Sequence, residues 1–179
     1  GLSQSSVTTI DQDKYGLLWF GTQDGLNRFD GQSFENFTSD NTPGIGNSYF
    51  KTSYRSHDDQ LWFGTSNGLT CYNPTTEEFK TYQLEGGFIL QIETIVEDNK
   101  GLLWLGTSSN GLCVFNKKTK KFKFILTQIP STKVLFIHFL NDQTLFVSTE
   151  DKGLYLYHIQ SKKVTPLLIE GKQKKYVRI

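Results

Sequence analysis

The sequence has no methionine, two cysteines and four prolines among its 179 residues. Cys71 and Cys113 lie at different distances after the glycines of their repeats, so we expect them on opposite faces of equivalent strands and unpaired. No apolar run approaches the roughly 20 residues that span a bilayer. No signal-peptide pattern opens the chain. Because methionine is absent, we expect an excised or processed piece of a longer chain.

The motifs of common active sites are also missing. There is no nucleophile elbow, Walker loop or dinucleotide fingerprint. The three histidines have no cysteine or carboxylate at ligand spacing. Asp11–Gly16 looks like half of a calcium loop, but the twelfth position is Thr22 instead of glutamate, which favours an ordinary hairpin turn. We therefore predict no metal, no cofactor, no catalytic residue and no enzyme activity for this segment.

One short phrase recurs four times. Leu-Trp-Phe-Gly-Thr occupies residues 18–22 and 61–65, Leu-Trp-Leu-Gly-Thr occupies 103–107, and Leu-Phe-Val-Ser-Thr occupies 145–149. The aromatic positions are 43, 42 and 42 residues apart, and a Gly-Leu pair follows each copy. A self-match at such a period indicates a repeat architecture.

Each repeat divides into four short segments separated by turn signals, which is typical of antiparallel strands. Four strands repeated at this period are the mark of a β-propeller blade, and no stretch has helical periodicity. We predict an all-β propeller domain over 1–179. Its four blades occupy residues 6–38, 49–82, 91–126 and 134–168, and a fifth blade begins near 176–179.

The repeated tryptophan and glycine are two residues apart in one strand, so they point to the same face. The ring fills the wedge between stacked sheets, and the glycine lets the neighbouring sheet approach. The glycine of the Gly-Leu pair that follows begins the next strand, and we expect it to have a positive φ. We predict packing between blades, not ligand binding, for Trp19, Gly21, Gly25, Trp62, Gly64, Gly68, Trp104, Gly106, Gly111, Phe146 and Gly153.

The phrase Trp-Phe-Gly-Thr at 19–22, followed by Asp-Gly-Leu-Asn-Arg-Phe-Asp at 24–30, resembles the two-component regulator propeller repeat. The likeness is clear in three units and weaker in the fourth, where Phe146 and Ser148 replace tryptophan and glycine. This resemblance implies a larger, seven-bladed propeller in the periplasmic, extracytoplasmic sensor region of a membrane-anchored bacterial hybrid histidine kinase. It also implies a carbohydrate (oligosaccharide) ligand and control of genes for its uptake and degradation.

In an up-and-down blade, the turns between the second and third strands lie at the same face as the links between blades. Loops held by a rigid scaffold are the usual place for binding. Polar amides with nearby rings at this face would suit a sugar, although each is also an ordinary turn or strand-start residue. The predicted ligand residues are Gln23, Asp24, Asn47, Tyr49, Asn67, Phe88 and Asn110.

Lysine runs at 117–121 and 162–163 lie in turns of the opposite face. They could attract an anion, but Glu77-Glu78 takes the same place in the second unit. We therefore expect a solvated surface and no nucleic acid.

Two rival functions stay open. One is a non-catalytic protein-interaction scaffold without a small ligand, and the other is a propeller lyase or hydrolase, for which the sequence offers no polar cluster. Four units leave two blade faces uncovered. We expect other blades or domains of the parent chain, or self-association, to cover them.

Overall fold

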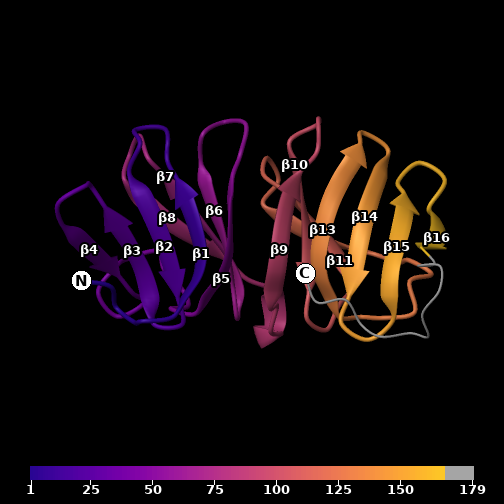
Figure 1. The fold of residues 1–179 in the computed structure, drawn as a ribbon, viewed down its shortest axis with the longest axis horizontal. Helices are drawn as coiled ribbons and strands as arrows, with labels where there is room; N and C mark the ends of the chain where they lie inside the picture. Colours follow the sequence, from indigo (N-terminus) through magenta and orange to yellow (C-terminus); the bar gives the residue numbers. More distant parts are fainter. Residues whose placement is uncertain (168–179) are drawn as a thin grey trace. The chain divides into compact units, whose positions relative to one another are not determined.

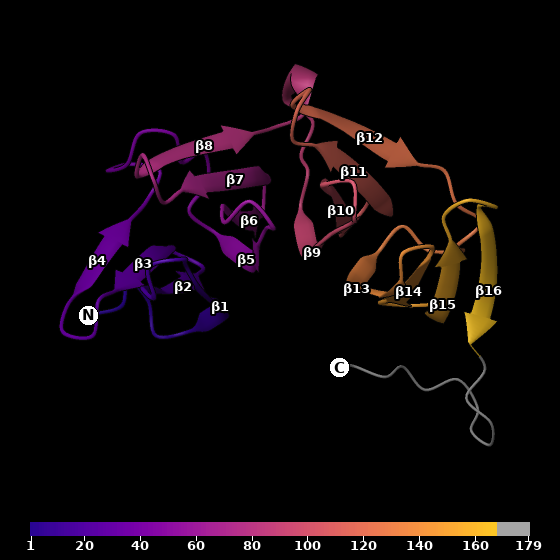
Figure 2. The ribbon, with the colours of Figure 1, turned by 90° about the horizontal axis from the view of Figure 1, so that it is seen from above.

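The computed structural model describes residues 1–167, which form four antiparallel sheets of four strands (Figure 1). Within each sheet the strands lie side by side in chain order (Figure 2). The predicted all-β propeller fold is confirmed. The predicted start of a fifth blade near 176–179 lies outside the described residues.

The strands of the first two sheets are β1 (Val7–Gln12), β2 (Leu18–Thr22), β3 (Gly25–Phe29), β4 (Phe34–Phe37), β5 (Phe50–Arg55), β6 (Leu61–Thr65), β7 (Gly68–Asn73) and β8 (Glu78–Tyr82). Those of the third and fourth sheets are β9 (Ile92–Glu97), β10 (Leu102–Thr107), β11 (Leu112–Asn116), β12 (Lys121–Ile125), β13 (Val134–Asn141), β14 (Thr144–Thr149), β15 (Gly153–His158) and β16 (Lys163–Leu167). Among residues 1–167 the only helix is one 3-10 turn, η1 (Glu85–Gly87).

The chain divides into two compact units, residues 1–95 and 96–179, with the boundary inside β9. The first unit contains the first two sheets, and its core is built around Trp19, Phe63 and Tyr72. The second unit contains most of the third sheet and all of the fourth, and Trp104 and Tyr157 belong to its core. Cys71 and Cys113 are both buried, and no disulfide joins them.

In the first unit, Trp19 and Gly21 of the first sheet both lie against the second sheet. Trp19 is fully buried, with its ring centre 4.5 Å from that of Tyr72 and 6.1 Å from that of Phe63 in the second sheet. A Cβ added to Gly21 would lie 3.0 Å from the Cβ of Phe50 in that sheet. The tryptophan and the glycine therefore face the same neighbour, and the missing side chain allows the close approach.

The indole N–H of each repeated tryptophan has a dedicated acceptor in the turn before its strand. Trp19 Nε1 donates to Asp13 Oδ2 at 2.9 Å, and Trp104 Nε1 donates to Asp98 Oδ2 at 3.1 Å. Trp62 Nε1 donates to Ser56 Oγ at 3.2 Å. The acidic turn around Asp13 is thus a hairpin turn whose carboxylate fixes an indole.

Candidate functional site

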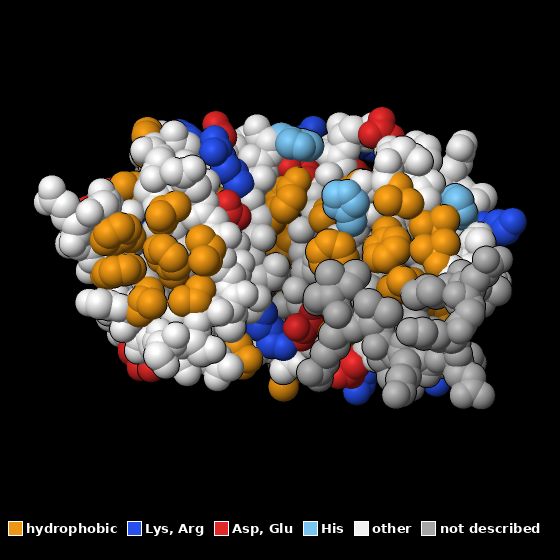
Figure 3. Space-filling model, in the orientation of Figure 1, with side chains coloured by type: hydrophobic (Ala, Val, Ile, Leu, Met, Phe, Trp, Pro, Cys, Tyr) orange, Lys and Arg blue, Asp and Glu red, His pale blue; other side chains and the backbone are white. Residues whose placement is uncertain are grey.

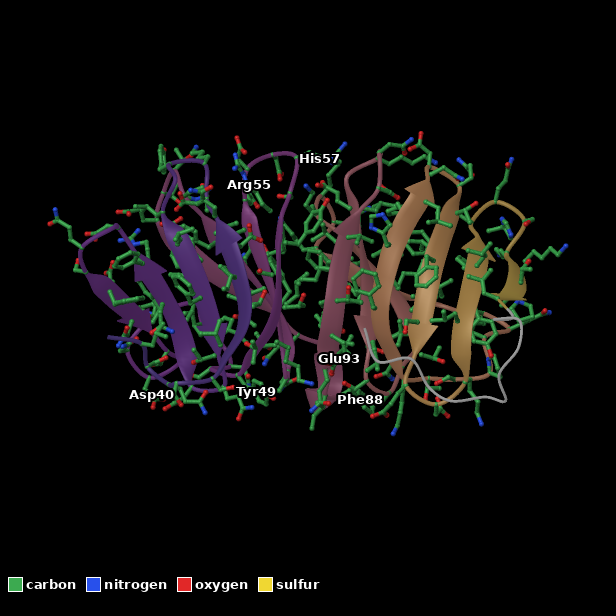
Figure 4. All side chains as sticks on the ribbon, viewed as in Figure 1. Asp40, Tyr49, Arg55, His57, Phe88 and Glu93 are labelled. Carbon is green, nitrogen blue, oxygen red and sulfur yellow. The ribbon has the colours of Figure 1, made fainter. Side chains whose placement is uncertain are left out.

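The two ends of the strands in the first unit carry different groups. Tyr49 and Phe88 lie at one end, and Arg55 and His57 lie at the other (Figure 4). The end with Tyr49 and Phe88 also holds the turns at 23–24 and 66–67 and the links at 38–49 and 83–91. We call this set of loops the link end of the first unit.

Backbone hydrogen bonds fasten the turns of the link end to the links. Gly25 N donates to Ser48 O at 2.8 Å, and Gly68 N donates to Leu90 O at 2.8 Å. Both glycines have positive φ, 123° and 112°, as predicted. Thr65 Oγ1 closes the second turn by donating to Gly68 O at 2.9 Å. The glycines and threonine of the repeat therefore hold the loops of the link end in fixed positions.

Three of the predicted ligand residues belong to one hydrogen-bonded network. Asn47 Oδ1 accepts from the backbone N–H of Tyr49 and from Ser66 Oγ, both at 2.9 Å. Asn67 Oδ1 accepts from Leu90 N at 3.3 Å, and its backbone carbonyl accepts from the Gln83 side chain at 3.1 Å. These side-chain oxygens hold the loops in place, so both asparagines have a structural role.

The other predicted ligand residues are less embedded. Gln23 and Asp24 are exposed, and Asp24 N donates to Thr22 Oγ1 at 3.1 Å. Phe88 is 71% exposed and its neighbour Ile89 is 64% exposed, directly after η1. Asn110 belongs to the second unit, where it accepts from Ser109 Oγ at 3.0 Å.

Sequence reasoning missed a hollow of about 280 Å³ in the second unit. Its walls are the link before β13 and the turn after β14, and it is lined by Ile129, Pro130, Ser131, Thr132, Lys133 and Asp151. The Ser131 hydroxyl donates to Asp151 and lowers the pKa of that carboxyl. The sequence signal that could have indicated this hollow is a link that contains serine and threonine, followed two strands later by a turn with an acidic residue.

At the other end of the first unit, Arg28 joins the first two sheets. Its guanidinium donates to Glu35 at 2.6 Å, to Glu77 at 2.8 Å and to the Tyr72 hydroxyl at 3.1 Å. It also lies 5.6 Å from the centre of the Trp19 ring. Arg28, Glu35 and Glu77 line a smaller hollow of about 170 Å³. Arg28 therefore pairs with Glu35 inside the first sheet and with Glu77 across to the second.

Part of the lysine run in the second unit also supports the fold. Lys117 forms an ion pair with Glu97, whose side chain is only 1% exposed. Residues 1–167 contain no cluster of three or more His, Cys, Asp or Glu side chains suited to a metal ion.

Residues 1–24 match the model of the two-component regulator propeller family. The opening segment of the chain is therefore similar to a two-component regulator propeller repeat. The structure of the extracellular domain of a hybrid two-component system from B. thetaiotaomicron matches 96% of this propeller chain with a TM-score of 0.83 and 26% identity. A second extracellular domain from the same organism matches 97% of it with a TM-score of 0.79 and 21% identity.

The propeller chain spans about a quarter of these solved chains, 26% and 23% of their lengths. Histidine kinase P4 of Formosa agariphila is 69% identical to it over 35 residues, which are 20% of this chain and 3% of the kinase. In the described part of the propeller, no helix has the length and apolar character needed to cross a membrane.

Proposed function

We propose that this chain is part of the extracytoplasmic, periplasmic ligand-sensing propeller of a bacterial hybrid two-component histidine kinase and response regulator. The observation that carries the proposal is the likeness to an extracellular domain of such a system, with a TM-score of 0.83 and 26% identity over 96% of this chain. In this proposal the propeller has no catalytic role. The parent chain contributes the kinase, and the membrane anchor also belongs to the parent.

The proposed ligand is a carbohydrate fragment bound at the link end of the first unit. Phe88 and Tyr49 offer rings on which the apolar face of a sugar can pack, and Gln23 and Asp24 offer donors and acceptors for its hydroxyl groups. Asn47 and Asn67 hold these loops in place through the contacts described above. Binding would then be transmitted to the kinase and alter transcription of genes for uptake and degradation of that carbohydrate.

This proposal is tested by calorimetric titration of the full-length native protein against a panel of oligosaccharides. Phe88→Ala should weaken binding by about tenfold, which corresponds to roughly 1.4 kcal/mol. Tyr15→Ala is the matched control, because Tyr15 is 62% exposed and lies in the β1–β2 turn at the other end of the strands. Absence of heat across the whole panel would contradict a carbohydrate ligand.

A second candidate function is a protein-interaction scaffold. The adjacent exposed side chains of Phe88 and Ile89, at 71% and 64%, favour it, because neighbouring apolar groups in water are common at docking surfaces. A partner that is captured by the native protein and lost with Ile89→Ser, together with no response to glycans, would support this function over the first.

A further inference from the structure

The loops of the link end in the first unit carry charge of one sign. Asp24 lies in the first turn, Asp40 in the first link and Glu85 in η1 of the second link, and all three side chains are exposed. The same loops contain no lysine, arginine or histidine. Figure 4 places Asp40 at the same end of the strands as Tyr49 and Phe88. A ligand that packs on these rings therefore meets a negative field.

A lysine at the start of β5, next to these loops, is already paired. The Lys51 ammonium forms an ion pair with Glu93 of β9, and only 18% and 20% of the two side chains are exposed. Lys51 Nζ also lies 5.6 Å from the centre of the Tyr49 ring. A carboxylate or sulfate on a ligand would have to displace Glu93 before it could bind this ammonium.

The contacts of Lys51 show how an ammonium group is held at this end. It lies near one aromatic ring and one carboxylate, and both kinds of group attract an ammonium ion. The second link brings the same two kinds of group together in η1. The Phe88 ring is 71% exposed and lies 3.3 Å from a Cβ added to Gly86, and the exposed Glu85 directly precedes that glycine.

The other end of the first unit differs because cations accompany its carboxylates. Arg55 pairs with Asp59 at 2.6 Å, and Arg28 pairs with Glu77 at 2.8 Å. Figure 3 shows basic side chains beside acidic ones at this upper end. The other end therefore presents both signs of charge to a ligand, whereas the loops of the link end present only one.

We propose that the link end selects carbohydrates by charge, binding oligosaccharides with free amino groups in preference to neutral ones and disfavouring those with carboxylate or sulfate groups. The inference rests on the proposed carbohydrate function and names the class of sugar that this site takes. An ammonium group of the ligand packs against the Phe88 ring and donates to Glu85, while Asp24 and Asp40 add to the field. Residues 1–95 contain twelve aspartates and glutamates against five lysines and arginines, so the field of the whole unit has the same sign.

The discrimination should be moderate because these carboxylates are exposed. In water at low salt, a unit charge about 8 Å from another changes an affinity by roughly twofold. Three carboxylates should therefore favour a single ammonium over a neutral group by about tenfold, and disfavour a single carboxylate by a similar factor.

Calorimetric titration of the full-length native protein with three β-1,4-linked tetrasaccharides, of glucosamine, glucose and glucuronic acid, tests the inference. At pH 6.5 and about 10 mM salt, the amino tetramer should bind about tenfold more tightly than the neutral one, and the acidic tetramer about tenfold more weakly. Salt at about 300 mM should reduce both differences to less than about threefold. Equal affinities, tightest binding of the acidic tetramer, or no heat from the amino tetramer would overturn the inference. Binding of a neutral sugar from the panel above would in each case leave the carbohydrate function intact.

Variants test whether the loops cause the selection. Asp40→Asn combined with Glu85→Gln should reduce the ratio of amino to neutral affinity by about fivefold, because two of the three charges are lost. Glu78→Gln is the matched control, since it removes an exposed carboxylate at the start of β8, at the other end of the strands. It should change that ratio by less than about twofold. An equal effect of the two changes, or an unchanged ratio in the double variant, would overturn the inference.

Discussion

The contact between Asp13 and Trp19 predicts a specific energetic coupling. Asp13 is 2% exposed, and its carboxylate accepts from the backbone N–H groups of Tyr15 at 2.9 Å and Leu17 at 3.1 Å as well as from the indole. Asp13→Ala removes all three bonds. It leaves an indole N–H with no acceptor inside a fully buried ring.

The expected cost follows from burial. A buried donor left without a partner costs about 1–3 kcal/mol, and bonds to a charged acceptor lie at the upper end. The two backbone N–H groups sit in a turn that water reaches, so they add less. We expect Asp13→Ala to lower the free energy of unfolding by about 3 kcal/mol. Trp19→Phe removes the donor as well, so the double variant should be less destabilised than the sum of the single variants by about 2 kcal/mol.

Urea unfolding followed by far-ultraviolet circular dichroism measures this coupling, with equal m values required across the four proteins. Ser56→Ala is the comparison variant. It removes a neutral acceptor of the buried Trp62 indole at 3.2 Å, together with the bonds of the Ser56 hydroxyl to Asp58 and Gln60 O, and should cost about 1–2 kcal/mol, less than Asp13→Ala. Additivity of Asp13→Ala and Trp19→Phe within about 0.5 kcal/mol would refute the reasoning, because it would mean that the carboxylate does not stabilise the indole.

Three further predictions concern packing and protonation. Gly64→Ala places a Cβ 2.6 Å from Ile92 Cγ2 and should cost about 1–3 kcal/mol in urea unfolding, so an unchanged midpoint would contradict the close approach. Burial raises the pKa of the Cys113 thiol to about 12, so iodoacetamide at pH 8 should label it only in urea, and rapid native labelling seen by mass spectrometry would be inconsistent. Burial also raises the pKa of Asp11 above its ordinary value of 3.8, so the native state holds this proton more tightly than the unfolded chain. The contribution of Asp11 to the free energy of unfolding should therefore rise as the pH falls through its native pKa. Asp11→Asn should stabilise the fold at pH 7 and reduce the change in stability with pH. Urea midpoints at pH 4, 5 and 7 measure both effects.

Repetition made the scaffold predictable. The strand β6, Leu61–Thr65, and the shared face of its Trp62 and Gly64 follow from a period-2 pattern that recurs at fixed spacing. The indole acceptors were missed, although the sequence contains a signal for them. The residue six positions before each tryptophan is Asp13, Ser56 or Asp98, whereas Leu140 precedes Phe146, which has no N–H to satisfy.

The loops were less predictable because their paths depend on contacts with other strands. The link at 38–49 is polar and rich in turn residues, which correctly indicates a loop but says nothing of its course. In the structure Ile45 is 5% exposed, and Gly46 N donates to Thr81 Oγ1 at 2.8 Å. The course of this link over β8 is determined by contacts with side chains about 35 residues away, which local sequence patterns do not encode.

Positions that break the repeat carry the information that the repeat itself lacks. The counterparts of Arg28 in the other sheets are Cys71, Val114 and Leu156, so the first sheet alone offers a cation at this place. The counterparts of its partner Glu77 are Lys120 and Lys162, which would repel it. Arg28 would therefore be attracted by the second sheet, which has Glu77 at this position, and repelled by the third or fourth, which have a lysine. Such a difference in free energy between the native contact and its alternatives is what gives specificity. Arg28 therefore makes a contact specific to the first two sheets, whereas the contacts of Trp19 and Gly21 belong to positions common to the repeat.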